Sequence, residues 1–284
     1  MDKIIRRVVP EDKPDISYVE SQSTPGLRYL DEVFSEFSQD QDGDFSVVEI
    51  DGQVVGCGKL TPMPDGSAWL ESLRVLPLFQ GLGVGKLFYT RFFQLAQERR
   101  IPVVRMYTNE ANAKSKGLAE RFGFREVAAY RGYILPAQEF PRPVGPTSGW
   151  EMVQDPQLAA ELIMPMARLW DGFMVMNRTF YAIVPALARV LAAQGQVFLH
   201  SPTNSLLVLG SRFMPQQALH IGLINQELSL GLSLALDSAR QRGVERLQVM
   251  FPPDRTELED FFRDRGFARE KQDLVVMEAT LTPG

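Results

Sequence analysis

The chain has 284 residues, 45% of them hydrophobic and 23% charged, which is a globular composition that excludes disordered and fibrous classes. Its 35 acidic and 30 basic side chains give a formal charge of −5 without a basic block, which argues against a general binder of nucleic acid or membrane surfaces. A single cysteine, Cys57, excludes an intramolecular disulfide framework, and two histidines are too few for a histidine-rich metal site. At this length we expect two domains.

The sequence also predicts where the protein works. Its first residues lack the apolar stretch and cleavage region of a signal peptide. The longest nearly uncharged stretch, 190–211, is interrupted by polar residues and proline, so it is not a membrane span. We therefore expect a soluble, cytoplasmic protein.

The N-terminal half predicts short strands alternating with helices. Helices are expected to open at Pro10-Glu11-Asp12, to follow Gly85 as far as Arg100, and to cover 112–122. The long middle helix has an apolar face at helical spacing, made by Leu87, Phe88, Phe92, Leu95 and Ala96. Asp51-Gly52 is typical of a hairpin turn, and Gly123 of a helix C-terminus. Strands are expected at 4–9, 45–50, 54–59, 69–75, 103–108, 125–129 and 132–135.

A proline- and glycine-rich segment at 136–149 predicts a domain boundary. Its prolines remove backbone donors and forbid regular helix, so it favours a semi-stiff linker. We expect an N-terminal domain at 1–138, a linker at 139–149 and a C-terminal domain at 150–284.

The C-terminal half repeats the order of the first. Two helices rich in Leu and Ala are expected from Pro156 to Ala193, with breaks at Pro165 and Pro185. The tails of the halves are alike, because 119–126 and 262–269 each place Gly-Phe after a helix that follows a strand. This pattern indicates an internal duplication with diverged copies. The remaining expected elements are strands at 197–200, 206–209, 219–224, 245–251 and 274–281, and helices at 227–242 and 257–265.

The most informative motif is Gln80-x-x-Gly83-x-Gly85 between a strand and a helix. Glycines let the backbone approach a ligand and aim several N–H groups at one point, and the helix N-terminus adds positive charge, so pyrophosphate is the natural occupant. A Walker A loop is discarded, because Gln80 and Leu87 stand where Gly and Ser/Thr are required. A Rossmann loop fits poorly, because the next strand ends in Tyr107-Thr108 without an acidic residue. An ordinary glycine-rich turn remains an alternative.

This motif resembles the acetyl-CoA pyrophosphate loop of the GNAT superfamily of N-acetyltransferases, and the resemblance covers about 3–135. It is supported in chain order by Ile5-Arg6-Arg7 with Pro10-Glu11-Asp12, the Asp51-Gly52 hairpin with Val55-Gly56, Leu73-Arg74-Val75, and Asn112 with Gly123-Phe124. It implies an α/β fold with a mixed sheet, the acyl-CoA N-acyltransferase fold, in which the fourth and fifth strands splay apart around acetyl-CoA. With the duplication, it implies two tandem GNAT-like domains, the second degenerate.

The resemblance also implies site residues. Main-chain groups of Leu73 and Val75 would hold the pantetheine amides, N–H groups from Gln80 to Lys86 the pyrophosphate, and Asn112 would contact the cofactor from the opposite wall. A plain core strand and a helix N-cap are the structural alternatives for these strand residues and for Asn112. The full expected cofactor-binding set is Leu73, Arg74, Val75, Gln80, Gly81, Leu82, Gly83, Val84, Gly85, Lys86, Asn112 and Ser115, and no metal is needed.

Acetyl transfer to an amine needs a base, because the amine must be neutral when it attacks. Glu71 is the candidate, since family members use a strand carboxylate there and its neighbours are apolar; a solvated carboxylate or a partner for Arg74 or Arg105 is the alternative. The family's acid tyrosine is replaced by Ala119, so we expect Tyr107, Tyr130, Tyr133 or water to serve.

The acceptor and the second half are less determined. The stretch 222–231 lacks the glycine motif, and Glu227 would face a phosphate unfavourably, so we expect this half to support the first domain without binding CoA in the standard way. The stretch 45–74 weakly resembles histidine N-acetyltransferases, which favours a free amino acid or small amine as acceptor. Protein N-termini, aminoglycosides and polyamines remain open as acceptors, and a non-catalytic CoA-binding or scaffolding role also remains open. The sequence leaves the oligomeric state open.

Overall fold

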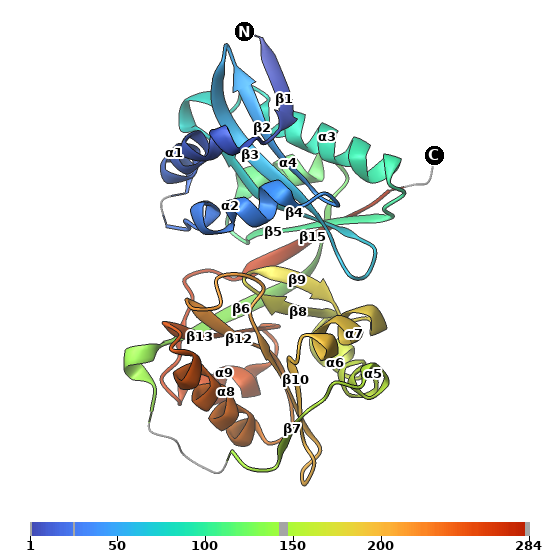
Figure 1. Cartoon of the computed structure of the whole chain (residues 1–284), viewed down its shortest axis with the longest axis vertical. Helices are drawn as coiled ribbons and strands as arrows, with labels where there is room; N and C mark the ends of the chain where they lie inside the picture. Colours follow the sequence, from blue (N-terminus) through green and yellow to red (C-terminus); the bar gives the residue numbers. More distant parts are fainter. Residues whose placement is uncertain (1, 25, 142–146, 282–284) are drawn as a thin grey trace. The chain divides into compact units, whose positions relative to one another are not determined.

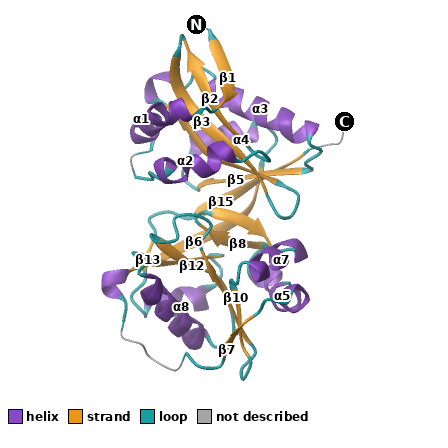
Figure 2. Cartoon of the chain, in the orientation of Figure 1, coloured by secondary structure: helices purple, strands orange, loops and turns teal. Residues whose placement is uncertain are grey.

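The computed structural model describes residues 2–24, 26–141 and 147–281. Its contacts divide the chain into two compact units (Figures 1 and 2). Unit 1 comprises Met1–Thr108, Asn112–Glu126 and Met277–Gly284, and unit 2 comprises Asn109–Ala111 and Val127–Val276. The contacts therefore change unit within the strands 103–109, 125–136 and 274–280, not at the proline-rich segment. The predicted linker lies partly outside the described residues, at 142–146, and as a boundary between homologous copies it stays a prediction.

Unit 1 is built on a mixed sheet. Strands β1 to β4 pair antiparallel in sequence order, and β4 pairs parallel with β5. The last strand of the chain, β15, lies next to β5, and its residues from Met277 onward belong to this unit. The strands are β1 (Lys3–Arg7), β2 (Asp44–Ile50), β3 (Gln53–Pro62), β4 (Ala68–Val75), β5 (Val103–Asn109) and β15 (Leu274–Thr280).

Helices cover both faces of this sheet, and β3 shows which helix lies where. A Cβ placed on Gly58 would lie 3.2 Å from Phe88 of α3, whereas the Lys59 ammonium lies over the Phe37 ring of α2. Because successive side chains of a strand point to opposite faces, α2 and α3 lie on opposite sides. The helices are α1 (Lys13–Ser23), α2 (Leu30–Gln39), α3 (Val84–Glu98) and α4 (Ala113–Glu120), with 3-10 turns at Pro10–Asp12 and Pro77–Phe79.

Unit 2 has a second mixed sheet in the order β6, β13, β12, β11, β10, β7, with the short β14 also paired to β6. Among the strand pairs described for this sheet, β12 and β13 are parallel and the others are antiparallel. The strands are β6 (Arg125–Pro136), β7 (Trp150–Met152), β10 (Val197–His200), β11 (Ser205–Gly210), β12 (Ala218–Ile224), β13 (Arg246–Phe251) and β14 (Ala268–Arg269). The helices are α5 (Pro156–Ile163), α6 (Met166–Leu169), α7 (Pro185–Ala193), α8 (Leu228–Arg242) and α9 (Thr256–Arg263). A 3-10 turn lies at Ala137–Glu139.

The two units share a supersecondary motif. In unit 1 the parallel strands β4 and β5 are joined by α3, and α4 follows and ends before Gly123 at φ +81°. In unit 2 the parallel strands β12 and β13 are joined by α8, and α9 follows and ends before Gly266 at φ +85°. The tails that looked alike in sequence therefore end the same motif, which supports the predicted duplication.

Two sequence expectations were wrong, and the helix α2 was missed. The stretch 173–182, expected as helix, forms a hairpin of β8 (Phe173–Met176) and β9 (Thr179–Ala182). Asn177 and Arg178, which form the turn, both have positive φ. Two successive residues with positive φ suit a hairpin turn and are incompatible with a continuing helix. The two strands expected at 125–135 are one strand, β6, because Gly132 continues the ladder opposite Met250. Helix α2 was not predicted, although its apolar face of Leu30, Val33, Phe34 and Phe37 is buried.

Candidate functional site

The strands β4 and β5 separate soon after they meet. Their ladder joins Ala68 to Val104 and Trp69 to Arg105, and among the described residues it goes no further, although β4 runs on to Val75 and β5 to Asn109. The rings of Trp69 and Tyr107 stack near this point, with centroids 6.2 Å apart. Polar main-chain groups that do not pair with the neighbouring strand can bind an extended ligand. The predicted splay of the fourth and fifth strands is confirmed.

A bulge interrupts β4 at Ser72, which sequence reasoning missed. Ser72 has φ +59°, and the register with β3 shifts so that Ser72 and Leu73 together lie opposite Gly58. Two contacts hold the bulge: the hydroxyls of Ser72 and Tyr29 are 2.8 Å apart, and the Cys57 thiol donates to the Ser72 carbonyl at 3.6 Å. A bulge leaves one residue out of the ladder and redirects its neighbours, so it alters the face that β4 presents beside the gap.

The glycine loop forms a cradle of main-chain N–H groups. Gly81 and Gly83 have φ of +81° and +84°, and Gly83 is the N-cap of α3. A Cβ added at either glycine would meet nothing within 4 Å, so the surrounding space is open. The N–H groups of residues 83–86 have no hydrogen-bond partner among the described residues. Together with the helix dipole they make an anion site that fits a pyrophosphate.

Side chains fix this loop in place. Gln80 donates through Nε2 to the Val75 carbonyl at 3.2 Å, which ties the loop to the end of β4. Lys3 donates through Nζ to the Leu82 carbonyl at 2.6 Å. A Cβ at Gly85 would lie 2.8 Å from Leu118 of α4, so this glycine lets α4 pack closely on α3. The three glycines 81, 83 and 85 therefore have separate roles.

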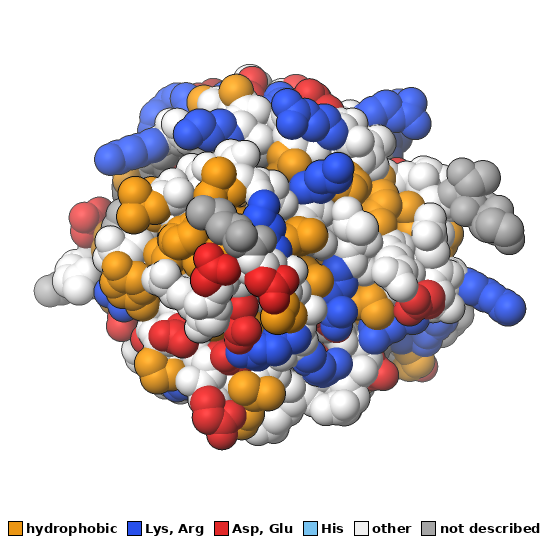
Figure 3. Space-filling model, turned by 90° about the horizontal axis from the view of Figure 1, so that it is seen from above, with side chains coloured by type: hydrophobic (Ala, Val, Ile, Leu, Met, Phe, Trp, Pro, Cys, Tyr) orange, Lys and Arg blue, Asp and Glu red, His pale blue; other side chains and the backbone are white. Residues whose placement is uncertain are grey.

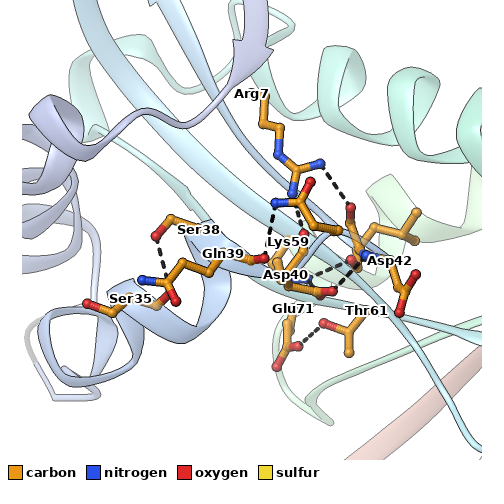
Figure 4. Close-up of polar contacts among 12 residues, drawn as sticks. Arg7, Ser35, Ser38, Gln39, Asp40, Asp42, Lys59, Thr61 and Glu71 are labelled. Carbon is orange, nitrogen blue, oxygen red and sulfur yellow. Dashed lines mark hydrogen bonds and ion pairs between the residues drawn. The ribbon is translucent and has the colours of Figure 1, made fainter.

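Glu71 lies on β4, one residue before the bulge, and is 8% exposed. Thr61 of β3 donates its hydroxyl to Oε1 of Glu71 at 2.5 Å. Lys59, directly opposite Glu71 in the ladder, pairs its ammonium with Asp40 and donates to the Leu60 carbonyl at 3.0 Å. In Figure 4 the Thr61–Glu71 pair lies apart from the contacts that join Arg7, Asp40 and Lys59. The carboxylate is therefore buried and oriented by a neutral hydroxyl.

The tyrosines expected to act as acid have different surroundings. Tyr107, on β5, is half-buried against Trp69 beside the gap. Tyr130 belongs to unit 2, where its hydroxyl donates to the carbonyls of Trp170 and Phe173 and burial raises its pKa. Tyr133, also in unit 2, donates to Glu259 at 2.8 Å. Of these three tyrosines, Tyr107 belongs to unit 1, as Glu71 does. Tyr130 and Tyr133 belong to unit 2.

Asn112 and Ser115 lie at the start of α4. The Asn112 side chain accepts a hydrogen bond from the Ser115 N–H at 3.1 Å, so Asn112 is the N-cap of this helix. Asn112 therefore has the N-cap role that was the alternative to cofactor binding. Its side-chain amide is exposed, and the NH₂ group of this amide can still donate hydrogen bonds. Ala119 is fully buried on the same helix.

The face of the molecule that Figure 3 displays is mixed in charge. Figure 3 shows Lys and Arg side chains along the upper edge of the face it displays, with acidic and apolar side chains interspersed below. No three His, Cys, Asp or Glu side chains within the described ranges gather as a metal site would need. Anion binding at the loop therefore depends on its local geometry.

Comparison with known proteins agrees with this geometry. Residues 13–124 match the model of the acetyltransferase (GNAT) family. This segment holds the glycine loop, β4, β5 and α4, so this part of the chain is similar to the GNAT superfamily of acetyltransferases. Enzymes of this family use an acyl-CoA and an acceptor.

The whole chain shares its fold with a tandem GNAT protein and with other GCN5-related N-acetyltransferases. A tandem GNAT protein from the clavulanic acid biosynthesis pathway matches over 100% of both chains, with a TM-score of 0.62 and 14% identity. A GCN5-related N-acetyltransferase from Sphaerobacter thermophilus matches 99% of this chain and 96% of its own, with a TM-score of 0.69 and 15% identity. One from Kribbella flavida matches 99% of this chain and 71% of its own, with a TM-score of 0.56 and 14% identity.

Two searches found nothing. No curated protein matches the chain significantly. Within the described residues, no helix has both the length and the apolar character needed to cross a membrane.

Proposed function

We propose that this protein is an N-acetyltransferase that moves an acetyl group from acetyl-CoA to the primary amine of a small molecule or amino acid by direct attack. The observation that carries the proposal is that the chain combines a cradle of N–H groups at residues 83–86 with an opening between β4 and β5. The cradle suits the diphosphate of CoA, and main-chain groups of Leu73 and Val75 would hold the pantetheine in the opening. Arg74 and Ser115 complete the proposed cofactor site, together with Asn112 and the loop from Gln80 to Lys86.

Glu71 is the proposed base. It would take a proton from the ammonium form of the acceptor, directly or through a water, because only the neutral amine attacks. The amine nitrogen then bonds to the thioester carbonyl carbon, the carbon–sulfur bond breaks, and the nitrogen loses a second proton as the CoA thiolate gains one. The Thr61 hydroxyl at 2.5 Å supports this role, since it orients the carboxylate without neutralising it.

In this proposal Tyr107 or water acts as the general acid. A main-chain N–H donates a hydrogen bond to the oxyanion. Protonating a leaving thiolate is undemanding, because its pKa is about 8.5. The bulge at Ser72 offers an N–H beside the reacting carbon, where negative charge develops on the oxygen. The Tyr130 proton is already donated to carbonyls, so Tyr107 is preferred over Tyr130.

The second unit is proposed to be degenerate in CoA binding. Its α8 begins after Glu227, whose negative charge opposes a phosphate at the helix N-terminus. A Cβ on Gly231 would lie 2.8 Å from Ile224 of β12, so the glycine of this first turn serves close packing. We expect one CoA site per chain.

Acetyl-CoA titration and a thiol-release screen against amines test the proposal. We expect one equivalent of acetyl-CoA to bind per chain and at least one amine to release thiol. Glu71→Gln keeps the acceptor oxygen for Thr61, so we expect unchanged acetyl-CoA affinity and a rate about 10²- to 10⁴-fold lower. Glu98→Gln, an exposed carboxylate of α3, is the control with unchanged rate.

Binding without turnover of any amine would instead favour a non-catalytic CoA-binding or scaffolding protein, which Ala119 at the family's tyrosine position also motivates. Turnover of peptide N-termini alone would favour acetylation of proteins. Absence of acetyl-CoA binding would contradict the proposal altogether.

A further inference from the structure

Arg74 has hydrogen-bonding capacity that the fold does not use. Its Nε is buried and has no hydrogen-bond partner in the part of the chain that the structure describes. Nη1 donates only to the carbonyl of the preceding residue, Leu73, at 3.3 Å. A buried donor without a partner costs free energy, and native proteins generally retain such a group where a ligand or water completes it.

Glu20, a carboxylate on which the charge of Arg74 acts, already accepts hydrogen bonds from other groups. Glu20 of α1 accepts hydrogen bonds from the main-chain N–H groups of Tyr29 and Leu30 at 3.1–3.3 Å, which satisfies the start of α2. No ion pair joins Glu20 and Arg74 among the described contacts, although the positive charge of Arg74 lowers the pKa of Glu20 against the larger opposing effect of burial. Within the described residues, the contacts of the Arg74 guanidinium therefore include no ion pair with a carboxylate.

The guanidinium is held in a fixed orientation by an aromatic ring. It lies 5.9 Å from the centroid of the Tyr29 ring, whose hydroxyl is bonded to Ser72 of the bulge. Stacking on an aromatic face leaves the edge of a guanidinium available, and its planar fork matches a carboxylate. Arg74 thus resembles a positioned receptor for an anion.

Arg74 and Glu71 lie on the same face of the sheet. Arg74 is opposite Cys57 of β3, and Glu71 is opposite Lys59 of β3. Gly58, between these two residues of β3, faces α3, so Cys57 and Lys59 both face the other side of the sheet. At about 3.3 Å per residue, their Cα atoms lie within about 10 Å of each other along β4. This places a base and a carboxylate receptor side by side, next to the opening proposed for the thioester.

We propose that the Arg74 side chain binds the carboxylate of the acceptor, so that the acceptor is an amino acid and not a simple amine. The inference rests on the proposed function, and it narrows the acceptor to compounds that carry a carboxylate near the amine. In this proposal the main chain of Arg74 contacts the cofactor, and the side chain of Arg74 binds the acceptor.

Calorimetric binding in the presence of CoA tests the proposal without requiring turnover. The probes are matched pairs: an α-amino acid and its α-amide, with phenylalanine, histidine, glutamine and lysine as the side chains. We expect at least one amino acid to bind about tenfold or more tightly than its amide. Arg74→Gln should remove that preference, and Arg74→Lys should restore only part of it, because lysine lacks the fork.

Three controls make the outcome decisive. Arg28→Gln removes the same charge from an exposed position beside Tyr29 and should leave the preference intact. Thermal melts check that each variant is folded. Acetyl-CoA affinity should be unchanged in Arg74→Gln; a loss there would assign Arg74 to a cofactor phosphate and overturn the inference.

The remaining outcomes separate this inference from the proposed function. If no pair shows a carboxylate preference, or if the preference survives Arg74→Gln, the inference is wrong even when acetyl transfer to amines is observed. If the preference depends on Arg74 but no probe is acetylated, the carboxylate site stands and the proposed function fails.

Discussion

Glu71, Ser72 and Arg74 are near neighbours in sequence, and each has a different environment. Glu71 meets the Thr61 hydroxyl, Ser72 takes a left-handed conformation, and Arg74 lies against the Tyr29 ring. The resemblance to the GNAT superfamily indicated Glu71, because family members use a carboxylate at this place on the fourth strand. The other two roles depend on Tyr29, which is distant in the chain, so the residue pattern of β4 alone carried no signal for them.

Cys57 gives a prediction at the residue scale. It is fully buried between β2 and β4, and burial raises the pKa of its thiol to about 12. The thiolate is the reactive form, so we expect no reaction with a thiol reagent such as DTNB at pH 8 in the folded protein, and one equivalent after denaturation. Rapid labelling of the folded chain would contradict the burial.

The same group predicts a pH dependence of stability. The folded thiol keeps its proton above about pH 8.5, where an unfolded cysteine loses it. The stabilisation from the neutral thiol is therefore complete below about pH 8.5 and is lost as the pH rises toward the folded pKa of about 12. Urea unfolding between pH 7 and pH 10 measures this, and Cys57→Ala should show a shallower decline.

At the scale of elements, the connection from β4 through the glycine loop into α3 determines the cofactor site. The sequence predicted this strand, loop and helix because glycines, apolar spacing and the loop motif are local signals. The prediction from sequence was wrong at the β8–β9 hairpin, because its apolar residues fit either a helix or a strand. The positive φ of Asn177 and Arg178, which the sequence did not reveal, makes this segment a hairpin.

The glycine loop yields a matched pair of substitutions. Gly83 and Gly66 have φ of +84° and +79°, and each has open space at Cβ. Alanine at either position should cost about 1 kcal/mol of unfolding free energy, because the left-handed conformation disfavours a Cβ. Only Gly83→Ala should also weaken acetyl-CoA binding, by about tenfold or more, since Gly83 begins the N–H cradle. Calorimetric titration and denaturant unfolding measure the two effects.

Equal acetyl-CoA affinities for Gly83→Ala and Gly66→Ala would show that the cradle is not the cofactor site. A loss confined to Gly83→Ala would separate the ligand role from backbone strain.

At the scale of the molecule, unit 1 is completed by the last strand of the chain. Glu278 of β15 pairs with Arg105 of β5, and Leu281 donates its N–H to the Pro102 carbonyl at 2.8 Å. These contacts belong to unit 1 although a long stretch of sequence separates the partners. A cut between the predicted domains therefore removes a strand from the first one.

A fragment experiment tests this arrangement. We expect the fragment 1–138 to unfold at a lower urea concentration than the same fragment with 274–281 supplied through a flexible Gly/Ser linker. The physical reason is that β5 loses its neighbour and exposes an edge. A linked segment with Glu278→Gln and Val276→Asp is the matched control and should rescue less. Equal stability of 1–138 with and without the segment would contradict the role of β15.

The sequence by itself determined the family resemblance, the loop motif, the α/β class and most of the elements, because these rest on signals within a few residues of one another. Tertiary structure decided what depends on pairing between distant segments: the bulge at Ser72, the burial of Glu71 by Thr61, the unpartnered Nε of Arg74, and the placement of β15 in unit 1. Strand register and side-chain partners are set by contacts between strands and helices far apart in the chain, so no local pattern of residues specifies them.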